Sequence, residues 1–90
     1  MSRAILLEID AERKSQDWQW GGPRHDDYHS MSDWAHFIQY QLEMAVLDAS
    51  ESGREQNWTM WRYRLIKVAA LAAAAIESGD RVKIARDEDR

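Results

Sequence analysis

Apolar residues recur at helical spacing along three segments of the chain, most strongly between residues 57 and 79. On a helix, eight residues of that segment share one face: Trp58, Trp61, Leu65, Val68, Ala69, Ala72, Ala75 and Ile76. Leu71 and Ala74 make a second side apolar as well. A helix that is apolar nearly all round is typically central, with neighbours on several sides. The pattern therefore predicts a core helix around which the chain folds.

Two earlier segments predict shorter amphipathic helices. The first is expected from Arg3 to Ser15, with Ser2 as its N-cap and with Ile5, Leu6 and Ile9 facing inward. The second runs from a capping box, Ser30-x-x-Asp33, to about Ser52. Its expected buried stripe comprises Trp34, Phe37, Ile38, Leu42, Ala45 and Ala49.

Helix breakers separate these segments. Gly21-Gly22-Pro23 interrupts a loop expected over residues 17–30, in which Trp18 and Trp20 are placed to hold the loop on the core. Ser52-Gly53 is expected to end the second helix, and Asn57 to cap the third. Gly79 is expected to close the third helix, leaving residues 81–90 as a charged tail. The prediction is one all-α domain over residues 1–90, an antiparallel helical hairpin with an N-terminal helix.

Composition narrows the range of partners. A chain of 90 residues buries a small core, yet it has five tryptophans and 44% hydrophobic residues, so some apolar surface is expected to lie between chains. Two paired hairpins would form a four-helix bundle, and a homo-oligomer is the expectation. The net charge of −4 argues against an extended DNA-binding surface. The absence of cysteine, of a membrane-spanning run and of a signal-peptide pattern predicts a cytoplasmic protein.

A basic cluster near the start of the third helix is one candidate site. Arg62, Arg64 and Lys67 are interleaved there with Trp58, Trp61 and Tyr63. Cations suit phosphate and aromatic rings suit a nucleobase, so the cluster fits a nucleotide. The alternative is a set of structural ion pairs with Asp48 or Glu43, which contribute about 0–1 kcal/mol each at a surface. The sequence leaves both interpretations open.

Two further groups carry metal-binding side chains. His25-Asp26-Asp27-Tyr28-His29 supplies two imidazoles and two carboxylates, either as metal ligands or as partners of backbone groups in a polar loop. The metal candidates are His25, Asp26, Asp27 and His29. A third group, Glu77 and Asp80 with Glu43 and Asp48, could hold Mg²⁺. No nucleophile–base arrangement or glycine-rich phosphate loop accompanies them.

The order of short motifs along the chain resembles that of a known family. The motifs are Ile5 with Ala11-Glu12-Arg13-x-x-Gln16-Asp17-x-x-Trp20-Gly21, then His25 and Trp34, then Tyr63-Arg64, Val68-Ala69-Ala70 and Ile76-Glu77-Ser78-x-Asp80-Arg81. Over residues 5–81 this succession is similar to small phage-borne MazG-like proteins, which belong to the all-α nucleoside triphosphate pyrophosphohydrolases. The resemblance implies antiparallel helices assembled as oligomers, with a nucleotide site at the bundle.

The family's metal-binding acids do not coincide with acids here. The family uses an E-x-x-E pair on one helix and an E-x-x-D pair on the next; these positions correspond to Gln41 and Met44, and to Arg64 and Lys67. Cations repel Mg²⁺ but hold phosphate directly. The resulting hypothesis is a non-catalytic, phage-encoded nucleotide-binding protein that sequesters a signal used in host defence. Its expected ligand-binding residues are Gln41, Trp61, Arg62, Tyr63, Arg64 and Lys67, with no cofactor.

Two alternatives accompany that hypothesis. The first is a Mg²⁺-dependent nucleoside triphosphate pyrophosphohydrolase that draws its acids from Glu43, Asp48, Glu77 and the Asp26-Asp27 loop. The second is an adaptor or inhibitor whose exposed aromatic residues dock a host protein. Pyrophosphate release distinguishes the first alternative, and the response of thermal stability to nucleotides distinguishes the second.

Overall fold

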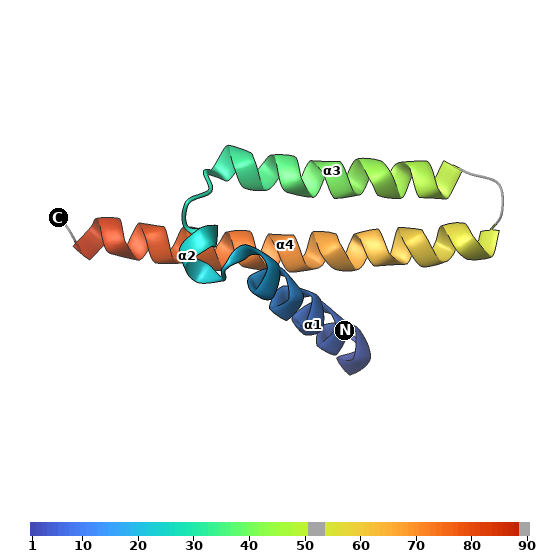
Figure 1. Ribbon diagram of the computed structural model, residues 1–90, viewed down its shortest axis with the longest axis horizontal. Helices are drawn as coiled ribbons and strands as arrows, with labels where there is room; N and C mark the ends of the chain where they lie inside the picture. Colours follow the sequence, from blue (N-terminus) through green and yellow to red (C-terminus); the bar gives the residue numbers. More distant parts are fainter. Residues whose placement is uncertain (51–53, 89–90) are drawn as a thin grey trace.

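The computed structural model describes residues 1–50 and 54–88, with side chains in the second range from residue 57 onward. Within these ranges the chain is all-helical, as predicted, and contains no strand. The helices are α1 (Arg3–Trp20), α2 (Pro23–Asp26), α3 (Met31–Ser50) and α4 (Arg54–Glu88). Figure 1 shows α3 lying along α4 and running in the opposite direction, while α1 crosses the other side of α4 at an angle. No helix in the described ranges combines the length and the apolarity that crossing a membrane requires.

The first helix is longer than predicted, because it ends at Trp20 rather than Ser15. Its N-cap is Ser2, whose hydroxyl accepts a bond from the Ile5 N–H. Gly21 ends the helix with φ of 97°, and its N–H donates to the Asp17 carbonyl. Gly22 follows at φ of 70° and ψ of −152°, a conformation that essentially only glycine adopts. The prediction of a continuous loop over residues 17–30 is therefore wrong, since the helix extends into it and Pro23 opens α2.

The two tryptophans of this region do not hold it on a core. Trp18 is 90% exposed and Trp20 is 59% exposed, because the added helical turn directs Trp18 to solvent.

The capping box that opens α3 is confirmed. The Ser30 N–H donates to Asp33 Oδ2 at 2.9 Å, and the Asp33 N–H donates to Ser30 Oγ at 3.0 Å. The predicted end of this helix at Ser52-Gly53 lies outside the described residues.

The last helix departs most from expectation. It begins at Arg54, so Asn57 is not its N-cap, and it continues through Gly79 to Glu88. Gly79 has no positive φ, and residues 81–88 are helical rather than a separate tail. One glycine costs a helix only about 1 kcal/mol, which propagation on both sides outweighs. The 35 residues of α4 set the 55 Å length of the molecule.

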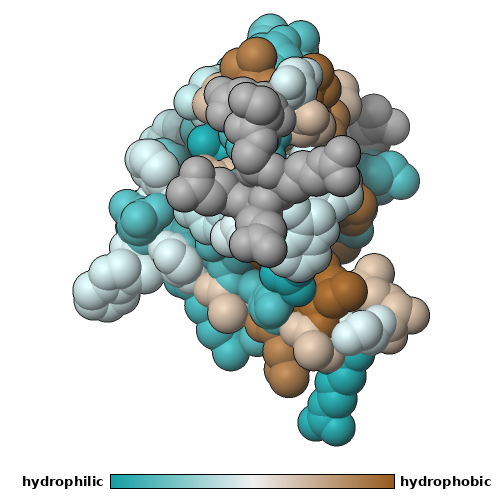
Figure 2. All heavy atoms as spheres, turned by 90° about the vertical axis from the view of Figure 1, so that its right-hand side faces the viewer, coloured by the Kyte–Doolittle hydropathy of each residue, from teal (hydrophilic) through white to brown (hydrophobic). Residues whose placement is uncertain are grey.

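The interior of a single chain is small. Among the described residues, the buried apolar side chains are Trp34, Ala45, Ala70 and Ala74. The expected inward residues Ile5, Leu6, Phe37 and Leu42 are all exposed by more than a third. Of the eight residues on the predicted core face of α4, none is buried. Figure 2, viewed from the end of the molecule where α4 begins, shows apolar residues gathered mainly toward its right-hand side.

Candidate functional site

A pocket of about 520 Å³ lies between α1 and α3, over α4, with α2 closing one end. That volume is within the range of small-ligand sites. The pocket is lined by Gln16, Gln19, Trp20, His25, Asp26, His29, Trp34, His36, Phe37, Tyr40, Gln41, Lys67, Leu71 and Ala74. The lining is largely aromatic, with three amides, one carboxylate and one ammonium group. This composition suits a planar ligand that also carries polar or charged groups.

The aromatic residues at the α2 end of the pocket contact one another in series. The Trp20 and His25 rings are stacked with centroids 6.1 Å apart. His29 meets His25 edge-on at 4.8 Å and contacts the Phe37 ring at 4.9 Å. Trp34 lies 5.3 Å from the same imidazole. Because His29 touches three rings, its position is fixed by α2, α3 and the turn between them.

The ammonium group of the pocket is Lys67. Its Nζ lies 3.3 Å from Glu12 Oε1 of α1 and 5.0 Å from the centre of the Tyr63 ring. Burial acts to lower the pKa of Lys67, but Tyr63 and Glu12 outweigh it, and the net pKa is raised. The side chain is therefore charged at neutral pH. It sits one turn away from Leu71, which lines the same pocket.

The other members of the basic cluster point elsewhere. Arg62 pairs with Glu8 at 2.7 Å. Arg64 Nε lies 3.6 Å from Asp48 Oδ2, and its Nη1 donates to Gln41 Oε1 at 3.3 Å. All three cations therefore contact a carboxylate, as the ion-pair interpretation of the sequence expected for Asp48. The three do not converge on one site.

The six residues expected from the sequence to bind a ligand are accordingly divided. Gln41 and Lys67 line the main pocket. Arg62 and Tyr63 line a second, more open pocket of about 490 Å³ between α1 and the first part of α4. Arg64 reaches the main pocket only through its bond to Gln41. Trp61 lines neither pocket and is 37% exposed on another face of α4.

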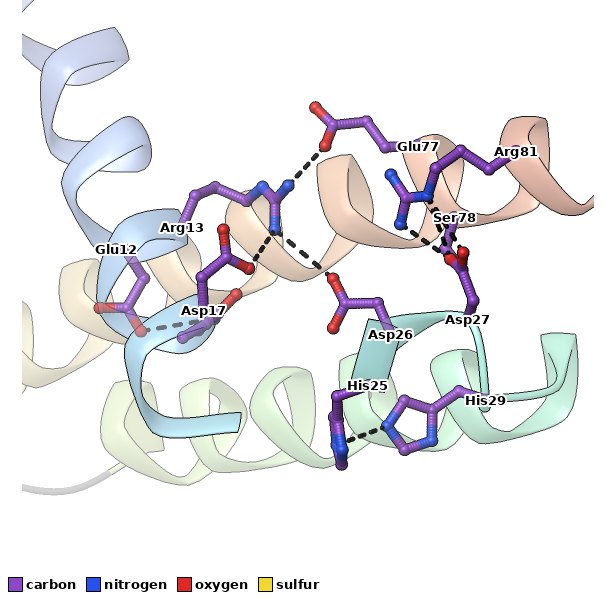
Figure 3. A network of polar contacts seen from close by, with 11 residues as sticks. Glu12, Arg13, Asp17, His25, Asp26, Asp27, His29, Glu77, Ser78 and Arg81 are labelled. Carbon is purple, nitrogen blue, oxygen red and sulfur yellow. Dashed lines mark hydrogen bonds and ion pairs between the residues drawn. The ribbon is translucent and has the colours of Figure 1, made fainter. Parts of the chain in front are cut away.

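The structure separates the four metal candidates as well. Figure 3 shows Asp26 directed toward Arg13, and Asp27 directed toward Ser78 and Arg81 of α4. The two histidines converge, with their Nε2 atoms 3.2 Å apart. No group of three or more His, Cys, Asp or Glu side chains that could hold a metal occurs among the described residues. Two imidazoles at this distance are accounted for by one hydrogen bond between them.

The carboxylates of this region join α1, α2 and α4. Asp27 accepts from Ser78 Oγ at 2.8 Å and from Arg81 Nη2 at 2.8 Å. The bond from Arg81 is the main cause of the lowered pKa of Asp27. Asp26 differs, because burial first and the charge of Asp17 second raise its pKa, with Arg13 acting in the opposite direction. The paired Asp27 is ionised at neutral pH and anchors α2 to α4.

The remaining acids considered for Mg²⁺ are spread over the molecule. Glu77 pairs with Arg13, and Asp48 faces Arg64. Glu43 accepts from Gln39 Nε2 at 3.1 Å on the exposed side of α3. Asp80 does not pair with Arg81, since that guanidinium binds Asp27. The proposed pairing of Glu77 with Asp80 as a metal site therefore has no support in these contacts.

Sequence reasoning missed much of the pocket. Gln16 and Gln19 lie beyond Ser15, the predicted end of the first helix, and they line the pocket because α1 continues to Trp20. On α3, His36 and Tyr40 also line the pocket and are spaced i,i+4. That spacing places two polar aromatic residues on one face beside Phe37, a signal available from the sequence.

Comparison with known proteins adds no relative, since no family model, curated protein or solved structure matches the chain significantly. The resemblance to MazG-like proteins consequently rests on the residues quoted for it. Any functional conclusion has to come from the site itself.

Proposed function

We propose that this protein binds a phosphate-bearing nucleotide without hydrolysing it. The observation that carries the proposal is the aromatic pocket of about 520 Å³ that has Lys67 and Gln41 on its lining. A nucleobase gains stacking energy from aromatic side chains, about 1–3 kcal/mol per base. A phosphate gains a charge-assisted hydrogen bond from an ammonium group. Both requirements are met by residues of one pocket.

The amides extend this argument to the base. Gln16, Gln19 and Gln41 each offer one acceptor and two donors, the groups that recognise the polar edges of a nucleobase. The carbonyl oxygen of Gln41 accepts from Arg64, so its NH₂ group is the part left for a ligand. Glu12 neutralises Lys67 in the free protein, and phosphate would take its place beside the ammonium group. Binding is then expected to weaken with increasing salt.

Binding without turnover is favoured by the way the acids are used. Glu12, Asp48 and Glu77 each lie against a cation, respectively Lys67, Arg64 and Arg13. A pyrophosphohydrolase needs several carboxylates to gather Mg²⁺ around the triphosphate. Here those carboxylates are spread along the helices and neutralised by neighbouring cations. The likeness to phage-borne proteins extends the proposal to sequestration of a nucleotide signal in host defence, by a MazG-like helical scaffold.

The test is a thermal-shift screen with nucleoside mono-, di- and triphosphates and cyclic dinucleotides, followed by calorimetry on each hit. A ligand at a hundred times its Kd stabilises the fold by about 2.7 kcal/mol. In parallel, each nucleotide is incubated with the protein and Mg²⁺ or Mn²⁺, and pyrophosphate is measured. Stabilisation without pyrophosphate release supports the proposal.

Two outcomes contradict it. Pyrophosphate release above the no-protein background identifies a metal-dependent pyrophosphohydrolase instead. No stabilisation by any nucleotide favours the alternative of an adaptor that docks another protein. Native mass spectrometry of the purified protein supplies an independent check, because a sequestered nucleotide adds its mass to that of the chain.

A further inference from the structure

One face of α4 is apolar and has no buried residue. It consists of Trp58, Trp61, Leu65, Val68, Ala69, Ala72, Ala75 and Ile76, here called the free face of α4. None of these residues is buried. Trp58, Trp61 and Ile76 are exposed, and the other five are intermediate in exposure. The buried residues of the helix are Ala70, Ala74 and Ser78, which point to the opposite side at 100° per residue. Within a single chain, α4 therefore has its buried residues on one side, and the free face stays partly exposed.

The other sides of α4 face α3 and α1. Toward α3, Arg64 contacts Gln41 and Asp48. Toward α1, Lys67 and Glu77 contact Glu12 and Arg13. Every charged residue of α4 between Trp58 and Ile76 lies outside the free face. The free face is thus an uncharged apolar stripe about 27 Å long at 1.5 Å per residue.

The molecule exposes more surface than a compact monomer of its size. Its accessible area is 7055 Å², whereas a compact monomer of 10.6 kDa has about 5,500 Å². Its radius of gyration is 15.2 Å, whereas about 12 Å is typical of 90 compact residues. The excess of about 1,600 Å² per chain is within the range that each subunit of an obligate dimer buries. Exposure of this size, with an apolar stripe at its centre, fits a second copy of the chain.

We propose that the free face of α4 packs antiparallel against the same face of a second chain. A two-fold axis between Val68 and Ala69 brings residues whose numbers add to 137 opposite each other. Leu65 then lies opposite the partner subunit's Ala72, and Trp61 lies opposite the partner subunit's Ile76. Val68 lies opposite the partner subunit's Ala69 at the axis. Large side chains thereby meet small ones in the middle of the interface, which lets the two helices approach to about 8 Å.

The register explains the composition of the stripe. The bulky residues Trp58, Trp61 and Leu65 precede its centre, and the alanines 69, 72 and 75 follow it. Only an antiparallel arrangement places the bulky half of one helix over the small half of the other. The contact is the same on both subunits, as two-fold symmetry requires. This inference concerns assembly and does not depend on the ligand of the pocket.

Sedimentation equilibrium of the whole chain at micromolar concentration tests the proposal. The expected mass is about 21 kDa, twice that of the chain. Val68→Glu places like charges at the axis and is expected to give a 10.6 kDa monomer. The matched control is Val46→Glu, which changes an exposed valine of α3 and should leave the dimer intact. A monomeric native chain overturns the proposal, and so does an assembly that Val68→Glu leaves intact.

Two further measurements separate loss of the interface from loss of the fold. An equimolar mixture of Val68→Glu and Val68→Lys chains is expected to recover the dimer mass, which unfolded chains would not do. Because the chain has no cysteine, a mixture of Leu65→Cys and Ala72→Cys chains tests the register directly. A disulfide between the two variants is expected under mild oxidation. Linkage of Val46→Cys with Ala72→Cys at an equal rate overturns the register.

Discussion

The neighbours of each basic residue decide what it can do, and Lys67 differs in this from Arg62 and Arg64. All three contact carboxylates, but only the Lys67 ammonium lines the aromatic pocket. Its pKa is raised by Tyr63 and Glu12 against the effect of burial, so it presents a full charge to a ligand. Arg62 and Arg64 have structural partners and lie outside this lining. One lysine, rather than a cluster of three cations, is expected to carry the phosphate contact.

Replacing Lys67 by alanine tests this at the residue scale. We expect nucleotide affinity to fall about ten- to a hundredfold, because one charge-assisted hydrogen bond is lost. The fold is expected to be retained although Glu12 loses its partner, and circular dichroism of the variant checks this. Calorimetry with the best ligand of the screen measures the change, and Lys83→Ala is the matched control. Equal binding by both variants would place the phosphate elsewhere.

Acid stability depends on another residue of the same region, Asp27. The pKa of its carboxyl is lowered in the folded protein, mainly by the bond from Arg81, below the ordinary value of 3.8. Its contribution to stability is therefore complete above about pH 5 and is lost as the pH falls through the lowered pKa.

We expect Asp27→Asn to lower Tm at pH 7. Between about pH 5 and pH 3, the Tm of this variant should fall less than the Tm of the native chain. Melting curves by circular dichroism across that range measure the slope. Asp87→Asn, a change of an exposed aspartate near the end of α4, serves as control and should reproduce the native acid slope. A native slope for Asp27→Asn as well would show that the pair with Arg81 does not contribute.

At the scale of the helices, Gly21 and Gly79 have different effects: the first ends a helix and the second does not. Gly21 ends α1 because it adopts φ of 97°, a conformation in which other residues are strained. Gly79 does not end α4, although it comes after an apolar run that predicts a helix end there. The two glycines differ in the residues after them. Gly21 precedes a second glycine and a proline, whereas Gly79 precedes a charged segment that is compatible with a helix.

The contrast predicts opposite effects of two alanine substitutions. Gly79→Ala is expected to raise the free energy of unfolding by about 0.5–1 kcal/mol, since alanine favours the helix interior. A Cβ at this position has no atom within 4 Å in the chain. Gly21→Ala is expected to lower the free energy of unfolding by about 1 kcal/mol, because a positive φ is unfavourable for alanine. Urea titration of both variants measures the two changes, and a loss of stability in Gly79→Ala would indicate that the helix stops there.

At the scale of the molecule, the proposed dimer would tie stability to assembly. A single chain buries four apolar side chains among its described residues, which is a small core for 90 residues. Burial of the free face of α4 between two chains would supply the missing apolar contact. Folding and association would then be one process, and we expect the folded monomer to have little stability of its own.

This predicts that Tm depends on protein concentration. Raising the concentration a hundredfold is expected to stabilise the dimer by about 2.7 kcal/mol by mass action. Calorimetric scans over that range, with Val68→Glu as the control, measure the effect. A Tm that stays constant for the native chain would indicate a fold that is stable as a monomer.

Local patterns in the sequence were enough to predict the helical class, the capping box at Ser30 and the break at Gly21-Gly22. These features depend on local chemistry, because side-chain caps and positive φ act within a few residues. The apolar stripe of α4 was predicted to be a core face, but none of its residues is buried within a single chain. Periodicity could not say whether that face is covered by the same chain or by another, since it reports only that a face is apolar.

Which polar residues meet depended instead on how the helices pack. His25 and His29 converge while Asp26 and Asp27 turn to arginines of other helices, although all four lie within five residues. Lys67 enters a pocket while Arg64 faces Asp48. The ion pairs among these contacts join residues 13 to 54 positions apart in the sequence, and no local pattern encodes the partner. The cover of the free face of α4 is undetermined by sequence for the same reason, because the proposed partner segment belongs to another chain.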